Sequence, residues 1–223
     1  MCYSAEASFI AGGVLTVTSI SIARIPKEKA SLPLSIIPAV FAVHQLIEGV
    51  IWLGQGKIGM GGAESLAVFL YALIAYVFWP VFIPYTSLWM EPEMWRRILI
   101  MICQAVGMVV GLGYLLGMLQ SPVGVSVYTC NLSYQVISLI DTGPAYIIAV
   151  TVPFLVSSHK GLVLFGLAIV LSCAAGLYLA SLPAFPSVWC FFAAFLSASL
   201  YAYFRAEQRS DVRETSINAY SSR

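Results

Sequence analysis

The stretch LPLSIIPAVFAVHQLIEGVIWL, residues 32–53, decides the fold of this chain. A helix needs about 20 mainly apolar residues to cross the hydrocarbon core of a bilayer, because each residue advances it by roughly 1.5 Å. The stretch is long enough for that crossing, and Glu48 is its one Asp, Glu, Lys or Arg residue. We therefore predict a transmembrane helix with a single acid inside the membrane.

The composition of the whole chain indicates the same class of protein. Its 223 residues are 60% hydrophobic and only 9% charged, and the mean hydropathy is +0.90. Soluble domains carry about 25% charged residues, so this chain has too few charges to cover a water-facing surface of that size. The lipid bilayer is its expected partner. The net charge of +1 gives no electrostatic basis for binding nucleic acid.

Seven segments qualify or nearly qualify as membrane spans. They predict an all-α polytopic transmembrane helical bundle over residues 1–204, followed by a polar tail, residues 205–223, that we expect to be cytoplasmic and disordered. The fifth segment is the weakest, because it is short and Pro153 interrupts it. The segments run Ala5–Ala23, Leu32–Leu53, Glu64–Leu88, Trp95–Leu119, Pro144–Ser157, Leu162–Leu182 and Pro186–Phe204.

The basic residues predict the orientation of the bundle. Seven spans place ten of the eleven basic residues on one side of the membrane and Lys57 alone on the other. Cytoplasmic loops carry the excess of Lys and Arg, so the N-terminus is expected outside and the C-terminus in the cytoplasm. The ten residues are Arg24, Lys27, Lys29, Arg96, Arg97, Lys160, Arg205, Arg209, Arg213 and Arg223.

The longest connection, Gln120–Gly143, lies on the outer side in this topology. Its middle, VSVYTCNLSYQVISL at residues 125–139, is rich in Val, Tyr and Ile around Asn131. Such a composition predicts a short hairpin or a lid between the fourth and fifth helices.

Small residues on the fourth helix indicate close packing. Gly107 and Gly111 form a G-x-x-x-G pair, and Gly113 and Gly117 repeat the spacing. Small residues four apart let helix backbones approach closely in lipid. We expect packing within the chain, with an oligomer or complex partner docking at Gly107 and Gly111 as the alternative.

The second helix carries the polar residues that are costly in a membrane. His44 lies roughly 16 Å along a helix that starts near Pro33, close to the bilayer midplane. Glu48 and Trp52 follow on the same face at successive turns, and Gln45 borders that face. An ionisable group at this depth costs about 2.5–3.5 kcal/mol on insertion scales, so the stripe is expected to face the bundle interior.

Two interpretations of this stripe stay open. It is either a polar network that sets helix register or a binding site for a polar or cationic ligand, a proton or a metal. Residues at the same outer depth extend the second interpretation to a pocket with aromatic walls. Its candidate ligand-binding residues are Glu48, His44, Gln45, Trp52, Trp189 and Asp141, and its candidate ligands for a transition metal are His44, Glu48, Cys2 and Cys190.

Four blocks of sequence resemble one family. They are MCYSA at the start, QLIEGVIWL at 45–53, FWPVFIP at 78–84 and PSVWCFFAA at 186–194. Together they are similar to an uncharacterised family of bacterial multi-pass membrane proteins that begin with a Met-Cys-aromatic-Ser-Ala motif. The resemblance implies an integral protein of the bacterial cytoplasmic membrane and names no reaction.

Three functions fit these observations. The first is a membrane protein that binds or transports a cation, a proton or a small polar ligand in the acidic, aromatic-walled pocket of its outer half. The second is a membrane-embedded metal-dependent enzyme that uses the same pocket, although a catalytic zinc needs three protein ligands and the chain has only two histidines. The third is a structural subunit of a membrane complex, in which the polar stripe only joins helices.

Overall fold

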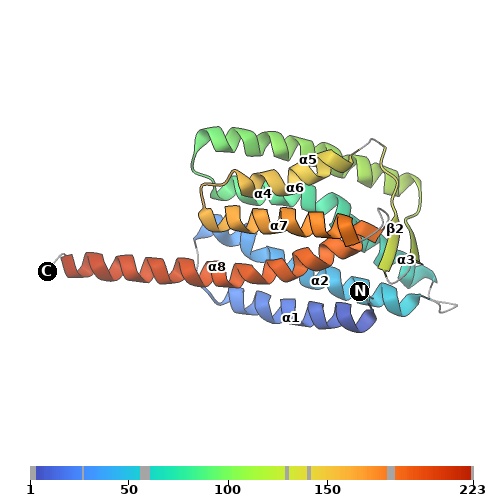
Figure 1. The fold of residues 1–223 in the computed structure, drawn as a ribbon, viewed down its shortest axis with the longest axis horizontal. Coiled ribbons are helices and arrows are strands. Elements are labelled where there is room, and N and C mark those ends of the chain that lie inside the picture. The colour runs from blue at the N-terminus through green and yellow to red at the C-terminus, as the bar shows by residue number, and fades with distance from the viewer. Residues whose placement is uncertain are drawn as a thin grey trace.

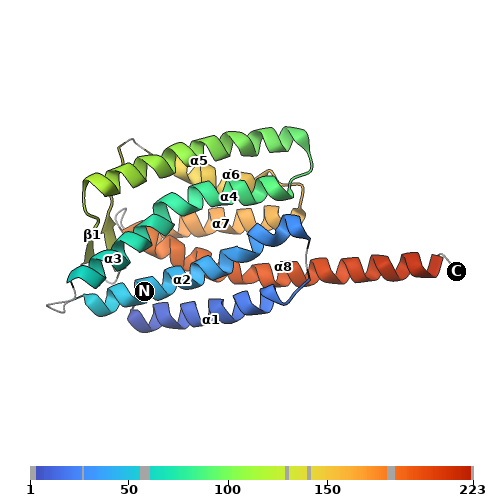
Figure 2. The same cartoon turned by 180° about the vertical axis from the view of Figure 1, so that it is seen from behind.

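The computed structural model describes residues 4–26, 28–55, 61–128, 131–139, 142–179 and 184–221. In this part of the chain, Figure 1 and Figure 2 show helices side by side in an elongated bundle with a small hairpin at one end. The helices are α1 (Ala5–Ala23), α2 (Leu32–Gly54), α3 (Gly61–Ala72), α4 (Trp79–Met90), α5 (Met94–Gln120), α6 (Gly143–Leu155), α7 (Lys160–Leu179) and α8 (Phe185–Ser221), with a short 3₁₀ helix η1 (Lys29–Ser31) and a π-helix η2 (Leu73–Phe78).

Six helical stretches among the described residues are long and apolar enough to cross a membrane. One of them, Ser65–Met90, contains most of α3 together with η2 and α4 as a continuous crossing. Large apolar side chains cover the outside of the bundle, and Ile10, Leu164 and Leu171 are each about 70% exposed. Such a surface suits lipid rather than water. The predicted all-α transmembrane bundle is confirmed.

The short fifth segment forms α6, an apolar helix that is shorter than the six candidate membrane spans. α6 has 13 residues, about 20 Å of helix, and runs from the hairpin end of the bundle to the end from which α8 projects (Figure 1). Extended chain precedes it along α5, where the Leu139 N–H donates to the Gly113 carbonyl at 3.4 Å. Because this extended chain lies against α5, α6 can be shorter than the other crossings.

The crossing Ser65–Met90 changes its helical register ahead of Pro80. In η2 the Trp79 N–H donates to the Ile74 carbonyl, five residues back. Proline has no N–H and disrupts the regular helix before it. The carbonyl five residues before Pro80, that of Ala75, accepts the Tyr146 hydroxyl at 2.5 Å. A side chain from α6 therefore occupies a backbone acceptor at the site of the disruption.

Glycines of α5 receive other backbone segments of the same chain. A Cβ atom added at Gly107 would lie 1.8 Å from the Pro80 carbonyl oxygen, and one at Gly111 would lie 3.2 Å from that of Val77. A Cβ at Gly117 would lie 2.0 Å from the Ile137 carbonyl oxygen. The expected packing within the chain is what the structure has. The alternative, a partner docking at Gly107 and Gly111, is corrected, because α4 and η2 already cover both glycines.

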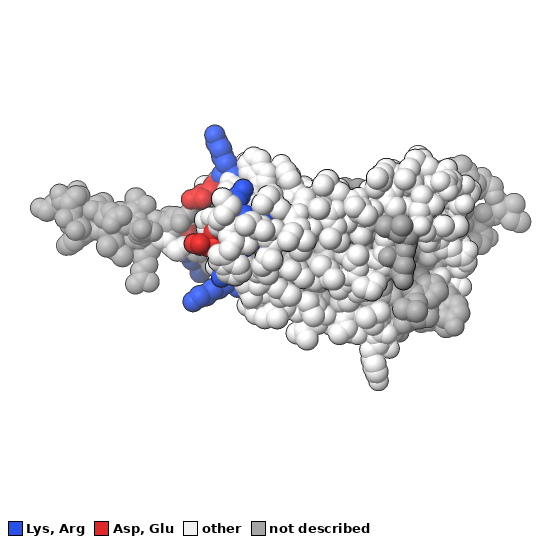
Figure 3. Space-filling model, turned by 90° about the horizontal axis from the view of Figure 1, so that it is seen from above, with Lys and Arg blue, Asp and Glu red and all other residues white. Residues whose placement is uncertain are grey.

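Charged residues gather at the end of the bundle from which α8 projects, as Figure 3 shows for one face. We call it the basic end. α1, α4 and α6 finish there and α2, α5 and α7 start there. It contains Arg24, Lys29, Arg96, Arg97, Lys160 and Arg205.

A buried acid ties two loops together at the basic end. Glu91 is 1% exposed and accepts the Ser158 N–H at 2.7 Å, the Ser158 hydroxyl and the Glu93 N–H. Arg96 donates to the Val156 carbonyl at 2.6 Å between the same two loops. Burial alone would raise the pKa of Glu91, but the hydrogen bonds from Ser158 and Glu93 and the charge of Arg96 hold it below 4.5.

The predicted hairpin is present at the opposite end, which we call the hairpin end. Strands β1 (Gly124–Tyr128) and β2 (Asn131–Gln135) pair antiparallel, with Val125 opposite Tyr134. β2 inserts Leu132 and Tyr134, which are 0% and 4% exposed, into a cluster with Ile51, Val68 and Cys190. The hairpin is therefore packed into the mouth of the bundle.

The tail differs from the sequence-based expectation. α8 continues as a helix to Ser221 and projects beyond the bundle (Figure 1), where the sequence predicts disorder after Phe204. Starting a helix is the costly step in its formation, and the last crossing supplies that start. Glu, Gln and Arg in the segment that follows are good helix formers.

Replacing Gly107 with alanine should strongly destabilise the protein. The new methyl group would overlap the Pro80 backbone, which cannot move without disturbing α4. We expect the free energy of unfolding to fall by about 3 kcal/mol or more, measured by thermal unfolding in detergent. Gly13→Ala is the matched control, because its Cβ would meet nothing within 4 Å, and it should be neutral or stabilising by up to about 1 kcal/mol. Equal effects of the two variants would contradict the packing described for α5.

Glu91→Gln should destabilise the protein in a way that depends on pH. The glutamine side chain has only one acceptor oxygen, and its NH₂ group would face a hydrogen-bond donor. We expect the free energy of unfolding to fall by about 1.5–3 kcal/mol. The folded pKa of Glu91 lies below the ordinary value of 4.5, so its stabilisation is complete above that value and is lost as the pH falls through the folded pKa. Melting temperatures of both proteins as a function of pH should converge in acid, and a constant difference would contradict this role.

Candidate functional site

The polar stripe of α2 is buried, with Glu48 joined to α8. His44 and Gln45 are 0% exposed and Glu48 is 2% exposed, whereas Val43 on the far face is 52% exposed. The Glu48 carboxylate accepts the Ser187 hydroxyl at 2.5 Å and the Gln45 side-chain amide at 3.3 Å. A helix with one polar face turns that face away from lipid. The acid therefore lies inside the bundle and joins α2 to α8.

His44 belongs to a stack of three buried rings. Its ring lies 4.1 Å from that of Tyr71 on α3, and the Tyr71 ring lies 4.2 Å from that of Tyr134 on β2. His44 Nε2 donates to the Tyr71 carbonyl at 3.3 Å, so His44 is held by α3 rather than by Glu48. The stack connects the hairpin to the midplane of the bundle.

Several buried polar atoms of this cluster have no hydrogen-bond partner in the described part of the chain. They are His44 Nδ1, Gln45 Oε1, Trp52 Nε1 and the hydroxyls of Tyr71 and Tyr134. The Tyr71 hydroxyl group is in electrostatic contact with Glu48, Cys190 and Tyr134. Buried polar groups in proteins normally have partners, so a cluster of unpaired atoms around one carboxylate indicates a site that takes up water or a ligand.

A cavity of about 460 Å³ lies next to this cluster at the hairpin end. We call it the tyrosine cavity. Six aromatic side chains line it, together with Gln135, Cys190 and apolar residues, and none of the described lining residues carries a charge. The aromatic members are Tyr76, Tyr114, Tyr134, Tyr146, Phe185 and Trp189. Ser187, the partner of Glu48, precedes Cys190 by one helical turn, so the carboxylate lies behind this wall.

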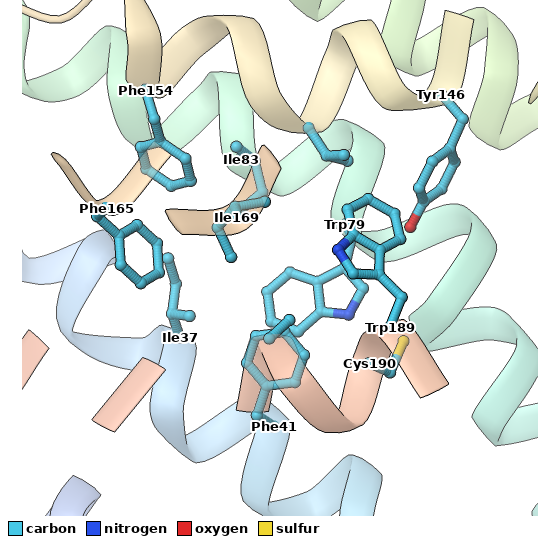
Figure 4. Close-up of a pocket in the computed structure, with 12 residues that line it drawn as sticks. Ile37, Phe41, Trp79, Ile83, Tyr146, Phe154, Phe165, Ile169, Trp189 and Cys190 are labelled. Atoms are coloured by element: carbon cyan, nitrogen blue, oxygen red, sulfur yellow. The ribbon is translucent and has the colours of Figure 1, made fainter. Parts of the chain in front are cut away.

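A second, smaller cavity of about 50 Å³ leads toward the basic end. Figure 4 shows its walls, with Trp79, Trp189 and Tyr146 at one end and Phe154 and Phe165 at the other. Its lining is almost entirely apolar. Tyr146, Trp189 and Cys190 line both cavities, so the two lie on either side of the same residues.

The two tryptophans that line the smaller cavity are held by ring stacking. Trp79 stacks on Phe41 at 4.2 Å, and Trp189 stacks on Phe185 at 5.3 Å. Trp189 also donates its indole N–H to the Ser172 hydroxyl at 3.1 Å. Rings that are already locked by packing lose little conformational freedom when a ligand binds.

The structure separates the predicted site residues into two groups. Trp189 and Cys190 line the cavities, whereas Glu48, His44 and Gln45 lie behind the wall and Trp52 packs beside the hairpin. The walls of the tyrosine cavity are mainly tyrosines from other elements, and a pocket lined directly by the α2 residues stays a prediction. Cys2 and Asp141, also predicted, lie outside the described residues.

The site includes residues that the sequence did not indicate. Tyr71, Tyr76, Tyr114 and Tyr134 are four of twelve tyrosines in the chain, and their spacing shows no pattern that marks them. Ser187 lies within the block PSVWCFFAA at the start of the last helix, but nothing in the sequence marks it as the partner of Glu48. Only the packing of α3, η2, α5, β2 and α8 brings these residues together.

The predicted metal ligands do not form a set among the described residues. In that part of the chain, no three His, Cys, Asp or Glu side chains gather in a way that could hold a metal ion. His44 uses Nε2 for the Tyr71 carbonyl, and Glu48 is engaged by Ser187 and Gln45. Cys2 is not among the described residues, so a transition-metal site that includes it stays a prediction.

A family model matches residues 1–216, almost the whole chain. The protein belongs to a family of unknown function, DUF6629. A search of curated proteins found no match, and a search of solved structures also found none. Membership in DUF6629 thus agrees with the expected uncharacterised family and assigns no reaction to the site.

Ser187→Ala should weaken the connection between α2 and α8. It removes the 2.5 Å donor to the buried Glu48 carboxyl group and leaves a buried acceptor without its partner, which costs about 1–3 kcal/mol. We expect a corresponding fall in the free energy of unfolding, measured by thermal unfolding in detergent. Ser199→Ala is the matched control, because this serine is exposed on the same helix and donates only to the Leu196 carbonyl within it. An effect of the same size at Ser199 would show that the Glu48 contact adds nothing.

Proposed function

We propose that this protein binds a small organic cation in the tyrosine cavity, with Glu48 as the counter-charge behind the cavity wall. One observation supports this most directly: six aromatic side chains surround the cavity, and the α8 wall between them is hydrogen-bonded to a buried carboxylate. Binding of this kind serves a membrane transporter or a receptor for such a cation.

The chemistry of the cavity favours a cation over other ligands. Aromatic faces attract weakly hydrated cations, and cages of Tyr and Trp are a common way to recognise quaternary ammonium groups. The lining contributes no Lys or Arg among its described residues, and the described basic residues gather at the other end. An anion would be repelled by the ring faces.

The proposed setting is the bacterial cytoplasmic membrane, with the tyrosine cavity in its outer half. The basic end then faces the cytoplasm, as the positive-inside rule requires. The hairpin and the N-terminus face outward in this orientation. A ligand would therefore approach the cavity from outside the cell. Labelling of a cysteine introduced in β1 by a membrane-impermeant reagent, in intact cells, tests this orientation.

Choline and tetraethylammonium are suitable probes for the proposed site. Their binding to the detergent-solubilised protein is measured by calorimetry, with 3,3-dimethyl-1-butanol as the uncharged analogue of choline. We expect a cation to bind saturably and the analogue at least tenfold more weakly, since cation–π attraction contributes about 0.5–2 kcal/mol. Binding of neither cation, or equal binding of choline and its analogue, would contradict the proposal.

Variants of Tyr114 test the role of the aromatic wall. Tyr114→Leu removes a ring that lines the cavity beside Tyr76 and should weaken cation binding roughly tenfold. Tyr114→Phe keeps the ring face and should bind almost normally. Tyr178→Leu is the control, because this side chain is 90% exposed and lies outside the cavity lining. A loss of affinity in Tyr178→Leu as large as in Tyr114→Leu would exclude a specific cage.

A further inference from the structure

We infer that cation binding in the tyrosine cavity is coupled to the release of one proton from Glu48, so that the protein exchanges a cation for a proton at this site. The inference rests on the proposed function and adds the chemistry of the same site. It follows from the surroundings of Glu48, which offer hydrogen-bond donors but no positive charge among the described residues.

The groups that interact with Glu48 come from four elements. They are Gln45 on α2, Tyr71 on α3, Tyr134 on β2, and Ser187 and Cys190 on α8. None of these groups is a Lys or Arg, and the described basic residues lie at the opposite end. α1 also packs on α2, but Glu6, the titratable residue of its described part, is exposed.

His44 does not supply the missing charge. Its ring is fully buried and stacked on Tyr71, and Nδ1 has no hydrogen-bond partner in the described part of the chain. A buried imidazolium with an unpaired N–H would be costly. An ionised Glu48 would then be an isolated charge in the membrane interior, which is also costly. Without a cation nearby, the carboxyl group therefore keeps its proton.

The site also provides hydrogen-bond donors for the ionised form of Glu48. Both carboxylate oxygens have a donor in place, Ser187 at 2.5 Å and Gln45 at 3.3 Å. A cation in the tyrosine cavity would lie on the other side of Cys190 and Tyr134, both of which line the cavity and are in electrostatic contact with Glu48. That cation supplies the positive charge which makes ionisation favourable.

The exchange balances in atoms and charge. The O–H bond of the Glu48 carboxylic acid breaks, and the proton passes to water on the hairpin side while the cation enters the cavity. One positive charge leaves and one arrives, so the net charge of the buried site does not change. The buried side chains of Tyr71 and Tyr134 interact with Glu48 and Tyr134 also lines the cavity, so their hydroxyls can pass the proton along.

Coupling of this kind is reciprocal: if the cation favours loss of the proton, loss of the proton strengthens cation binding. Over the pH range in which Glu48 keeps its proton, the affinity for the cation should rise tenfold for each pH unit. At higher pH it should become constant.

Calorimetric titration with choline between about pH 5 and pH 9 tests the inference. Titrations in two buffers of different ionisation enthalpy count the protons released per choline bound. We expect close to one proton at the acidic end and a tenfold rise in affinity per pH unit there. Glu48→Gln should release none and bind choline weakly and independently of pH, whereas Glu6→Gln, which alters an exposed acid, should behave as the wild type.

A reagent that modifies protonated carboxyl groups provides a test without substitutions. Dicyclohexylcarbodiimide should label Glu48 in the wild-type protein, as detected by mass spectrometry. Choline should protect Glu48 several-fold, and 3,3-dimethyl-1-butanol should not. Choline binding with no proton release and no pH dependence would overturn the exchange while leaving the proposed function intact. Absence of binding by any organic cation would overturn the proposed function itself.

Discussion

The hydrogen bond between Ser187 and Glu48 is the interaction on which the hairpin end of the molecule depends. It joins the second and the last crossings inside a medium that offers no water to a carboxylate. Tyr71 and Tyr134 lie against the same carboxylate, and Tyr134 brings the hairpin with it. Burial of the Glu48 carboxyl group thus depends on four elements, α2, α3, α8 and β2, whose side chains meet around it. The wall of the tyrosine cavity is a consequence of that convergence.

The absence of water inside the membrane also constrains the backbone. Pro80 disturbs the crossing Ser65–Met90, and the Ala75 carbonyl near this disturbance accepts the Tyr146 hydroxyl. Tyr146 is thereby held in the wall that separates the two cavities. Glycines on α5 let neighbouring backbones approach within contact distance. Irregular backbone inside a membrane persists only where the protein itself satisfies or covers it, and here that irregular region borders the cavity.

The buried acids at the two ends of the molecule have different electrostatic surroundings. At the basic end, Glu91 is buried among N–H and O–H donors with Arg96 nearby, which is a stable arrangement for an ionised acid and ties two loops together. At the hairpin end, Glu48 has donors but no basic neighbour among the described residues. The first acid is structural. The second has no such basic neighbour in the described part of the chain, and the proposed exchange with a cation rests on this difference.

The sequence by itself determined the membrane class, the crossings, the inward face of α2 and the hairpin, because these depend on length, hydropathy and spacing along one segment. The side of α5 that packs was also visible from its glycines. The cavity was not. Tyr71, Tyr114, Tyr134 and Ser187 come from four elements, and nothing in their local sequence distinguishes them from other tyrosines and serines. The helical course of α8 beyond Phe204 was missed because a polar segment resembles a disordered one unless the preceding helix is known to continue. Local patterns report which face a helix buries, whereas only the tertiary structure decides which buried faces meet, since that depends on contacts between residues far apart in the chain.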